Sequence, residues 1–331
     1  MSPDDRHAFV TGAAGFTGGH LARALRSRGW RVTGLVRNAN GAAALRDIGA
    51  EPVVGDLRSP DSFRSALAGV DVLYHIAAAF RQARLSNQEY SDVNIGGTRN
   101  VIEAAARAGV RRVVHCSTVG VHGDTGPMPA NEEAPFAPPD FYCETKLEGE
   151  TLARELFRRH GLEGVVFRPA GIHGPGDTRF LKLFRNVSRG RFVMIGSGNV
   201  RYHMTYIDDL VAGILLCGEK PEAAGEVFIL AGEADVSLDR LVREVAVAVG
   251  GRPNRLRIPM GPVLLAATIC EKLCRPLGIE PPLYPRRVEF FSKHRAFDIS
   301  KARRVLGYEP RVSLSEGFAR TAAWYRERGL L

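Results

Sequence analysis

A chain of 331 residues is long enough for one large domain or two smaller ones. Its 45% hydrophobic and 24% charged residues are typical of a globular protein, and no apolar run reaches the roughly 20 residues that span a bilayer. The net charge of +9 comes from arginines spread along predicted helices, without a nucleic-acid motif, so we do not expect nucleic acid as a partner. Five cysteines without Cys-x-x-Cys spacing, and no apolar signal region at the start, favour the reducing cytoplasm.

Short apolar runs alternate with helical patterns through the first two thirds of the chain. Strands are predicted at 7–11, 31–36, 52–54, 71–75, 111–116 and 164–168, and helices at 18–29, 41–48, 60–68, 94–109 and 140–160. The alternation predicts an α/β protein with a Rossmann-type, doubly wound parallel sheet. The near-continuous apolar character of the runs is typical of strands buried on both faces.

The regular alternation of strands and helices ends near residue 171. Helical patterns follow at 178–190, 205–217, 237–250, 261–275 and 313–328, with strand-like runs at 192–195 and 225–230. We expect residues 1–170 to form a nucleotide-binding domain to which 201–232 returns. Residues 171–200 and 233–331 would form a smaller C-terminal α/β region that binds substrate, with a cleft between the two parts.

The segment 261–278 is apolar but too short and too interrupted to cross a membrane. We expect a core helix or a lid over the substrate there, without stable membrane insertion. Shallow contact with a membrane surface and a dimer face are the alternatives.

Three glycines follow the first predicted strand. Gly12, Gly15 and Gly18 have a Gly-x-x-Gly-x-x-Gly spacing, and a helical pattern begins directly behind them. Glycines at such a turn let the backbone approach a phosphate, and the helix N-terminus supplies free N–H groups and a positive dipole. The turn therefore predicts a site for the diphosphate of a dinucleotide.

Tyr142 and Lys146 lie four positions apart on a predicted helix, so they share one face. A free phenol has a pKa of about 10, and a nearby ammonium or oxidised nicotinamide favours the phenolate. Such a tyrosine acts as a general base toward an alcohol or a general acid toward a ketone, and the lysine can also hold the ribose hydroxyls. With the glycine turn, the pair points to hydride transfer. No His, Cys and Asp cluster has metal-ligand spacing, so no metal is expected.

Over nearly its whole length the chain resembles the extended short-chain dehydrogenases/reductases, in the group of NAD-dependent epimerases/dehydratases and 3β-hydroxysteroid dehydrogenases. The matching segments are Thr11–Gly18, Gly55–Leu57, His75–Ala78, Asn94 in Val-Asn-Ile-Gly-Gly-Thr, His115–Gly123, Tyr142–Lys146, Arg168–Gly176, Phe297–Ala302 and Leu306–Tyr308.

The resemblance implies roles for residues that spacing alone does not assign. Thr118 would hydrogen-bond the substrate oxygen and complete the catalytic set with Tyr142 and Lys146, and Asn94 would organise a helix and a strand. Relatives often form dimers through the two helices that correspond to 94–109 and 140–160, so we expect a homodimer. The implied cofactor contacts are Gly12, Gly15, Phe16, Thr17, Gly18, Asp56 at the adenine amino group, Leu57 against the ring, Ala77, Ala78, Ser117 (also a weaker substrate candidate), Tyr142, Lys146 and Pro169 near the nicotinamide amide.

The second strand departs from the pattern of NAD-preferring relatives, which end it with an acidic residue. Here Val36 stands at that position and Arg37 follows. A carboxylate would repel a 2′-phosphate, whereas a guanidinium pairs with one bidentately. We therefore expect NADP, with NAD as the alternative, in which case Arg37 stacks on adenine or faces solvent.

The residues after Thr118 narrow the chemistry. Dehydratases of this group carry an Asp-Glu pair directly after this threonine, and nucleotide-sugar decarboxylases carry a glutamate two positions later. Val119 and Gly120 stand there instead. Alcohol/ketone hydride transfer of the hydroxysteroid, sterol or dihydroflavonol-reductase kind is the first hypothesis. A nucleotide-sugar 4-epimerase is the alternative, and a non-catalytic NADP-sensing protein is the remote one.

Several polar residues are weaker substrate candidates. His173 and Asp177 lie in the loop over the predicted cleft, and His203 replaces an aspartate common in relatives. Tyr202 stands where epimerases carry a diphosphate-binding arginine, with Arg201 one residue early. The remaining candidates for a phosphate clamp are Arg286, Arg287 and Arg295, while Asp208 and Asp209 are expected to cap or brace a helix. The sequence does not define the substrate.

Overall fold

The computed structural model describes residues 6–80, 85–252, 256–274 and 284–331. Seven parallel strands form one sheet in the order β11-β6-β5-β4-β1-β2-β3. The strands are β1 (His7–Thr11), β2 (Arg31–Val36), β3 (Glu51–Val54), β4 (Val72–His75), β5 (Arg112–Cys116), β6 (Glu163–Pro169) and β11 (Val227–Leu230). The predicted doubly wound parallel sheet is confirmed, and residues 227–230 supply its last strand.

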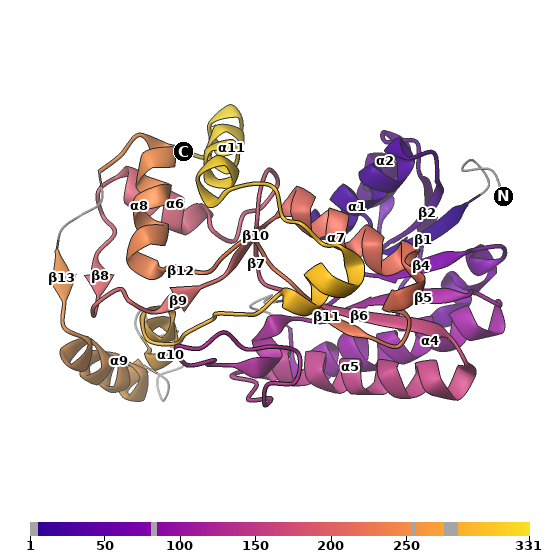
Figure 1. Ribbon diagram of the computed structural model, residues 1–331, viewed down its shortest axis with the longest axis horizontal. Helices are drawn as coiled ribbons and strands as arrows, with labels where there is room; N and C mark the ends of the chain where they lie inside the picture. The colour runs from indigo at the N-terminus through magenta and orange to yellow at the C-terminus, as the bar shows by residue number, and fades with distance from the viewer. Residues whose placement is uncertain (1–5, 81–84, 253–255, 275–283) are drawn as a thin grey trace.

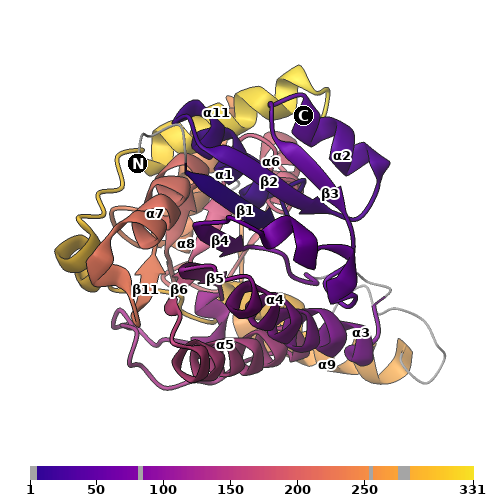
Figure 2. The same cartoon turned by 90° about the vertical axis from the view of Figure 1, so that its right-hand side faces the viewer.

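Helices cover both faces of the sheet, as Figures 1 and 2 show. One face carries α1 (Phe16–Ser27), α2 (Ala39–Arg46) and α7 (Ile207–Glu219), and the other carries α4 (Gly97–Arg107) and α5 (Phe141–His160). Apart from the edge strand β3, whose residues are exposed or half-buried, the strands are almost fully buried because both faces are covered, which explains their near-continuous apolar sequences.

Most of the remaining chain forms a smaller body with its own apolar core, at the left in Figure 1. The segment that contains Phe297, Ile299, Ala302, Leu306 and Tyr308 instead packs into the core beside the large sheet. Phe184, Leu241, Phe318 and Tyr325 are among its buried residues. Its helices are α6 (Leu181–Ser188), α8 (Leu238–Val249), α9 (Met260–Cys274), α10 (Pro285–Val288) and α11 (Leu314–Glu327). Two-stranded sheets pair β7 (Gly171–His173) with β10 (Met204–Tyr206), β9 (Arg201–Tyr202) with β12 (Val236–Ser237), and β8 (Met194–Ile195) with β13 (Arg257–Ile258).

Two local predictions need correction. The helix expected at 60–68 is a pair of short 3₁₀ helices, Pro60–Ser62 and Arg64–Leu67, because Phe63 between them has non-helical backbone angles, with φ −139° and ψ −14°. The helix expected at 94–109 begins as α3 (Asn87–Ser91), continues as a π-helical turn over Asp92–Gly96, and becomes regular only in α4.

The apolar helix predicted at 261–275 forms as α9, but it is not a core helix. Ala267 alone among its described side chains is fully buried, whereas Leu265, Ile269 and Leu273 expose 64%, 49% and 65% of their surface. In Figure 1, α9 lies at the lower left end of the molecule, away from the seven-stranded sheet.

Candidate active site

The three glycines form the turn between β1 and α1. Gly12 has a φ of +69°, which only glycine adopts easily, and a Cβ atom added there would lie 2.9 Å from the Cα of Ala77. A Cβ atom on Gly18 would lie 2.2 Å from the carbonyl oxygen of Gly12. Both positions therefore require glycine for close backbone packing.

The first turn of α1 is prepared for an anion. Gly15 precedes the helix without a side-chain cap, and the first turn, which includes Phe16 and Thr17, has no acidic residue. The first N–H groups of a helix have no partner within it, and the helix dipole makes this end positive. The residues present thus fit the diphosphate of a dinucleotide, with Thr17 half-buried behind Phe16.

Thr11, at the end of β1, ties the glycine turn to the next strand. Its Oγ1 accepts hydrogen bonds from the backbone N–H groups of Ile76 and Ala77, both at 3.1 Å, and lies 2.8 Å from Nδ1 of His75. Ala77 and Ala78 are half-buried at this carboxyl edge of the sheet. Ala77 packs directly against Gly12 of the turn.

At the other end of the expected dinucleotide, Arg37 and Asp56 follow neighbouring strands, since β2 pairs with β3 up to Val36 and Val54. Arg37 is exposed. The Asp56 carboxylate pairs with Arg58 at 2.6 Å; this bond and, more weakly, the charge of Arg37 lower the pKa of Asp56. Leu57 is buried behind Asp56. Arg37 thus presents a cation at the end of β2, and the Asp56 carboxylate is held in its charged form.

Lys146 is a deeply buried cation near the end of β5. Its side chain points to that strand, where Nζ donates a hydrogen bond to the backbone oxygen of Cys116 at 2.6 Å, and only 3% of the residue is exposed. Burial lowers the pKa of Lys146, while Cys116 and Glu150 act in the opposite direction. An ammonium held this far from water favours any oxyanion formed beside it.

Tyr142 lies one helical turn before Lys146, at the start of α5. The helix begins after Asp140, whose carboxylate accepts a hydrogen bond from the backbone N–H of Cys143 at 2.7 Å. The Tyr142 ring packs edge-on against Phe80 at 5.0 Å and Tyr90 at 6.4 Å between ring centroids. This aromatic surround fixes the phenol and excludes water from one side.

Thr118 and Ser117 complete the group at the end of β5. Thr118 Oγ1 accepts a hydrogen bond from the backbone N–H of Gly120 at 3.1 Å, so its own proton can be donated to another oxygen. The Ser117 hydroxyl is buried and has no hydrogen-bond partner within the described part of the chain. Pro169 is buried at the end of the adjacent strand β6, where it pairs with Leu230.

Asn94 links the segment after β4 to the tyrosine helix α5, as expected of an organising residue. Its side-chain oxygen accepts from the backbone N–H of Ala79 at 2.8 Å, and its amide donates to the Ala79 carbonyl and to Thr145 Oγ1. Thr145 in turn donates to the carbonyl of Tyr142 at 2.9 Å. Thr98, which donates to the Asn94 carbonyl, also lies 3.1 Å from His75 Nε2.

Sequence reasoning missed His115, which lies inside the site. Its ring is buried against His75 at 5.2 Å between centroids, and neither ring nitrogen has a hydrogen-bond partner among the described residues. Burial, with the charge of Lys146, holds the pKa of His115 well below its usual value. Because a histidine that follows an apolar strand pattern is more often a core residue, the sequence carries no signal for this placement.

Arg179 is the second residue that the sequence did not reveal. Its guanidinium stacks over the Phe16 ring at 5.2 Å and lies 6.0 Å from the Phe80 ring, which itself touches Tyr142. An ion pair with buried Asp177 holds it in place. Arg179 thus connects the phosphate turn with the tyrosine end of the site.

His173 packs in the core of the smaller body rather than against the residues named above. Its ring contacts Tyr206 and Phe318 at 5.6 and 4.7 Å between centroids, and burial lowers its pKa to about 3. Asp209 accepts from the backbone N–H groups of Arg311 and Val312, a bracing role, while Asp208 is exposed.

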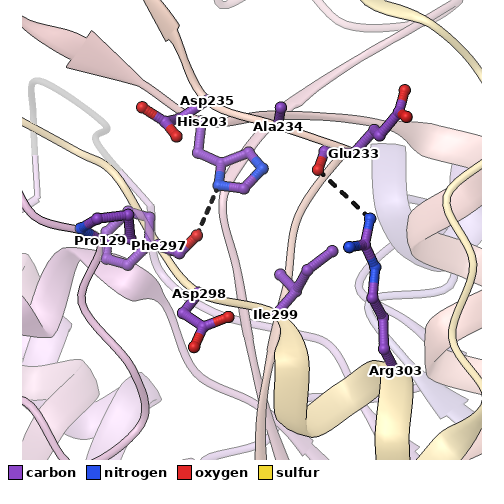
Figure 3. Close-up of a pocket in the computed structure, with 9 residues that line it drawn as sticks. All are labelled: Pro129, His203, Glu233, Ala234, Asp235, Phe297, Asp298, Ile299 and Arg303. Atoms are coloured by element: carbon purple, nitrogen blue, oxygen red, sulfur yellow. Dashed lines mark hydrogen bonds between the residues drawn. The ribbon is translucent and has the colours of Figure 1, made fainter.

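His203 is also held by backbone groups. Its ring nitrogens lie 3.1 Å from the carbonyl oxygen of Phe297 and 2.9 Å from that of Gly232. The ring lines a pocket of about 350 Å³ together with Glu233 and Arg303. Figure 3 shows how these side chains lie. Thr118, Tyr142 and Lys146 do not line this pocket.

Of the arginines considered for a phosphate clamp, two make contacts with other side chains and two have side chains that the structure does not describe. Arg295 donates to the Tyr202 hydroxyl at 2.6 Å and stacks on its ring, and Arg201 pairs with Asp235. These contacts are structural. The side chains of Arg286 and Arg287 lie outside the described part of the molecule.

Two further features complete the description. In the described residues no helix is long and apolar enough to cross a membrane. Within the same residues no group of three His, Cys, Asp or Glu side chains is arranged to hold a metal ion.

A glycine turn between β1 and α1, a buried lysine one turn after a tyrosine, and a seven-stranded parallel sheet define an enzyme of the short-chain dehydrogenase/reductase class. A sequence model described as the NAD dependent epimerase/dehydratase family matches residues 8–231. The chain belongs to this family.

Relatives along the whole chain agree with this assignment. A protein named sterol demethylase protein B from Methylococcus capsulatus is 36% identical, with 97% of this chain and 99% of that protein covered. A 3-beta-hydroxysteroid dehydrogenase from Mycolicibacterium neoaurum is 31% identical, with 99% and 93% covered.

Solved structures show the same fold. The structure of gox2253 has a TM-score of 0.84 at 30% identity and covers 98% of this chain and 99% of its own. A short-chain dehydrogenase/reductase superfamily protein from Agrobacterium tumefaciens, solved with bound NAD, has a TM-score of 0.75 at 25% identity, with 98% of each chain covered.

Proposed function

We propose that this enzyme transfers a hydride between a nicotinamide cofactor and the carbon of a secondary alcohol or ketone on an apolar substrate. The observation that carries the proposal is the burial of Lys146, which lies on the same helix as Tyr142 and bonds to the end of β5. A bound nicotinamide would supply or accept the hydride. The protein has to hold the substrate oxygen and move one proton.

In alcohol oxidation, Tyr142 takes the hydroxyl proton as the hydride leaves the same carbon, and in ketone reduction it returns that proton. Lys146 stabilises the phenolate form and holds the ribose hydroxyls. Thr118 donates its hydroxyl proton to the substrate oxygen, since its own oxygen already accepts from Gly120. Buried Ser117 offers a second hydroxyl beside it.

We assign NADP as the preferred cofactor. The support is local: Arg37 is exposed at the end of β2, and the position before it holds Val36 rather than a carboxylate. A guanidinium binds a 2′-phosphate bidentately, and no carboxylate at position 36 repels it. Asp56 would then receive the adenine amino group, and Leu57 would pack against the ring.

Three observations favour an apolar alcohol, such as a hydroxysteroid or sterol, as the substrate. The full-length relatives named above include a sterol demethylase protein and a 3-beta-hydroxysteroid dehydrogenase. Val119 and Gly120 supply no acid or base for loss of water or carbon dioxide. Tyr202 occupies the position at which epimerases carry a diphosphate-binding arginine. Its hydroxyl donates to the Phe290 carbonyl, and this arrangement disfavours a nucleotide sugar as the substrate.

We further assign the smaller body, residues 171–200 and 233–331, to substrate binding, and residues 1–170 with 201–232 to cofactor binding. The separate apolar core of the smaller body supports a division into two parts, although Tyr202 and Met204 pack in that core and Phe297–Tyr308 contribute to the core beside the large sheet. A homodimer through the faces of α4 and α5 stays a prediction. The five cysteines all lie in the described part and are free thiols, which suits the reducing cytoplasm that we propose as its compartment.

The test is mass spectrometry of the nucleotide released by the purified, denatured protein, followed by turnover of NADPH or NADP with a panel of apolar secondary ketones and alcohols. We expect reversible binding of added NADP(H) and net oxidation or reduction. Near-stoichiometric bound nucleotide with no net redox turnover would favour the 4-epimerase instead. Unchanged biological activity of Tyr142→Phe would favour the sensing protein.

A further inference from the structure

Glu150 is a buried carboxylate on the tyrosine helix α5. Tyr142, Lys146 and Glu150 recur every four positions, so they lie above one another on one face of the helix. Only 1% of Glu150 is exposed, against 3% of Lys146. The reaction proposed above assigns Glu150 no task. Its position nevertheless places a carboxylate one helical turn beyond the ammonium of Lys146, on the side away from Tyr142.

Arg168 holds this carboxylate from β6, and Figure 1 shows α5 running below that strand. Its Nε donates to one oxygen of Glu150 at 3.0 Å and its Nη2 donates to the other. The third guanidinium nitrogen donates to the Glu132 carbonyl at 2.9 Å and lies 3.0 Å from Nε2 of His122. A bidentate pair of this kind fixes the orientation of both groups. The Glu150 carboxylate is therefore held at one point beside α5.

Stability alone does not explain a pair that is buried on both sides. Taking two charges out of water is costly, and replacing such a pair by apolar residues of similar volume is often neutral or stabilising. A second pair, Arg112 with Glu163, joins the other ends of β5 and β6, but there the glutamate is partly exposed. A fully buried carboxylate differs from an apolar residue in one respect: it acts strongly on other charges nearby.

Three titratable groups of the sheet also act on Lys146, namely Cys116 and His115 on β5 and His75 on β4. Burial raises the pKa of Cys116 to about 11 and lowers that of His75 to about 3, and it holds the pKa of His115 well below its usual value. At neutral pH all three are therefore uncharged. Burial also lowers the pKa of Lys146, and the charge of Glu150 opposes that effect.

We propose that Glu150, clamped by Arg168, is a positioning residue that keeps the buried Lys146 in its charged form. Without this carboxylate, Lys146 would give up its proton at a lower pH, and the Tyr142 phenolate would lose its cation there. The consequence for Tyr142 rests on the proposed function. The link between Glu150 and the protonation of Lys146 does not.

The test is the titration of Lys146 itself, followed by nuclear magnetic resonance of Cε in the full-length protein made with isotope-labelled lysine. The chain has six lysines, so the signals are few, and Lys146→Arg assigns the relevant one. In the parent, Lys146 should keep its proton well above neutral pH. Glu150→Gln should lower the midpoint of its titration by roughly one unit or more, and Glu150→Asp, which keeps the charge, should lower it less.

Glu150→Gln leaves the Arg168 guanidinium unpaired inside the protein and so destabilises the fold. The double variant Glu150→Gln, Arg168→Gln removes the carboxylate without leaving a lone charge, and it should shift Lys146 in the same direction. The matched control is Arg112→Gln, Glu163→Gln, which removes the pair at the other ends of the same strands. This control should lose stability and keep the parental Lys146 midpoint.

A parental midpoint below neutral pH overturns the proposal. So does a double variant whose Lys146 midpoint equals that of the parent, or a control that shifts it as far as the double variant does. The titration needs no turnover, so it stands if the proposed reaction fails. Where turnover is found, the alkaline limb of kcat against pH should move to lower pH in the Glu150 variants, by the same amount as the Lys146 midpoint.

Discussion

Lys146 donates a hydrogen bond from Nζ to the main-chain oxygen of Cys116 at 2.6 Å, and this bond joins the tyrosine helix to the strand that ends in Ser117 and Thr118. A side-chain ammonium thus sets the distance between a phenol on α5 and two hydroxyls after β5. Burial also lowers its pKa, so the same residue has a geometric and an electrostatic role.

Tyr142→Phe removes the proton donor and leaves the ring packing against Phe80 and Tyr90. We expect kcat to fall by about 10²- to 10⁴-fold, because a positioned acid–base group contributes on this order. The affinity for cofactor should change little. Fluorescence titration with NADPH alongside steady-state kinetics separates the two effects, and a variant with near-parental kcat would remove Tyr142 from the reaction.

Lys146→Met should impair both cofactor affinity and kcat, since the lysine serves the ribose and the phenolate. The pH profile gives the sharper readout. Without the ammonium, the pKa that governs alcohol oxidation should move upward, because the phenolate loses its cation. A profile of kcat against pH for Lys146→Met with an unmoved limb would contradict this role. Lys146→Arg, which keeps the charge, should shift the limb less.

Arg37→Gln tests the cofactor assignment. Loss of a charge-assisted pair with a 2′-phosphate should raise the KM for NADPH by roughly tenfold to a hundredfold and leave that for NADH nearly unchanged. Arg23→Gln, on the neighbouring helix α1, is the matched control for a simple loss of surface charge. If NADH is preferred by the parent enzyme, the assignment is wrong.

Arg179→Met should shorten the residence of the dinucleotide. The guanidinium lies between Phe16 and Phe80, so a dinucleotide that runs from the glycine turn to Tyr142 passes beside it. We expect the dissociation rate of NADPH, measured by stopped flow, to rise on the order of tenfold. Arg179→Lys should recover part of the loss, and equal rates in all three proteins would rule out the contact.

Buried neutral histidines predict acid sensitivity. The pKa values of His75 and His173 fall to about 3 in the folded protein because burial disfavours the charged ring, against 6.5 when free. Below pH 6.5 the unfolded chain therefore binds protons that the folded chain does not, and stability falls as the pH falls. Each such histidine contributes about 1.4 kcal/mol per pH unit.

Denaturant unfolding between about pH 5 and 6.5 measures this slope, in a range where carboxylates titrate little. His173→Gln should lower the slope by about one proton while it also lowers stability at neutral pH, since the ring fills space between Tyr206 and Phe318. A slope equal to that of the parent would mean that His173 is protonated in the folded state.

The sheet was predictable because parallel strands buried on both faces are written as short apolar runs. The predicted helix at 60–68 is interrupted where Phe63 takes non-helical backbone angles, which composition does not reveal. Helix α9 shows a second limit. Its apolar residues are visible in the sequence, but which of them are buried depends on tertiary packing.

The candidate site divides in the same way. Gly12 and the Tyr142–Lys146 pair have a fixed local spacing, so the sequence exposes them. Arg179 meets Phe16 and Phe80 from more than ninety positions away, and nothing near it in the sequence marks the contact. The sequence does not indicate the placement of His115 either, because a histidine in an apolar strand looks like any other core residue.

The hydrogen bonds from Thr11 through His75 and Thr98 to Asn94 and Thr145 form an unbroken line from the phosphate turn to the backbone of the tyrosine helix. The glycine turn and the tyrosine helix are therefore parts of one connected frame, and a substitution at Thr98 or Asn94 would disturb both of them at once. If the smaller body binds the substrate as proposed, a substrate of a new shape can be accommodated there while this frame stays unchanged.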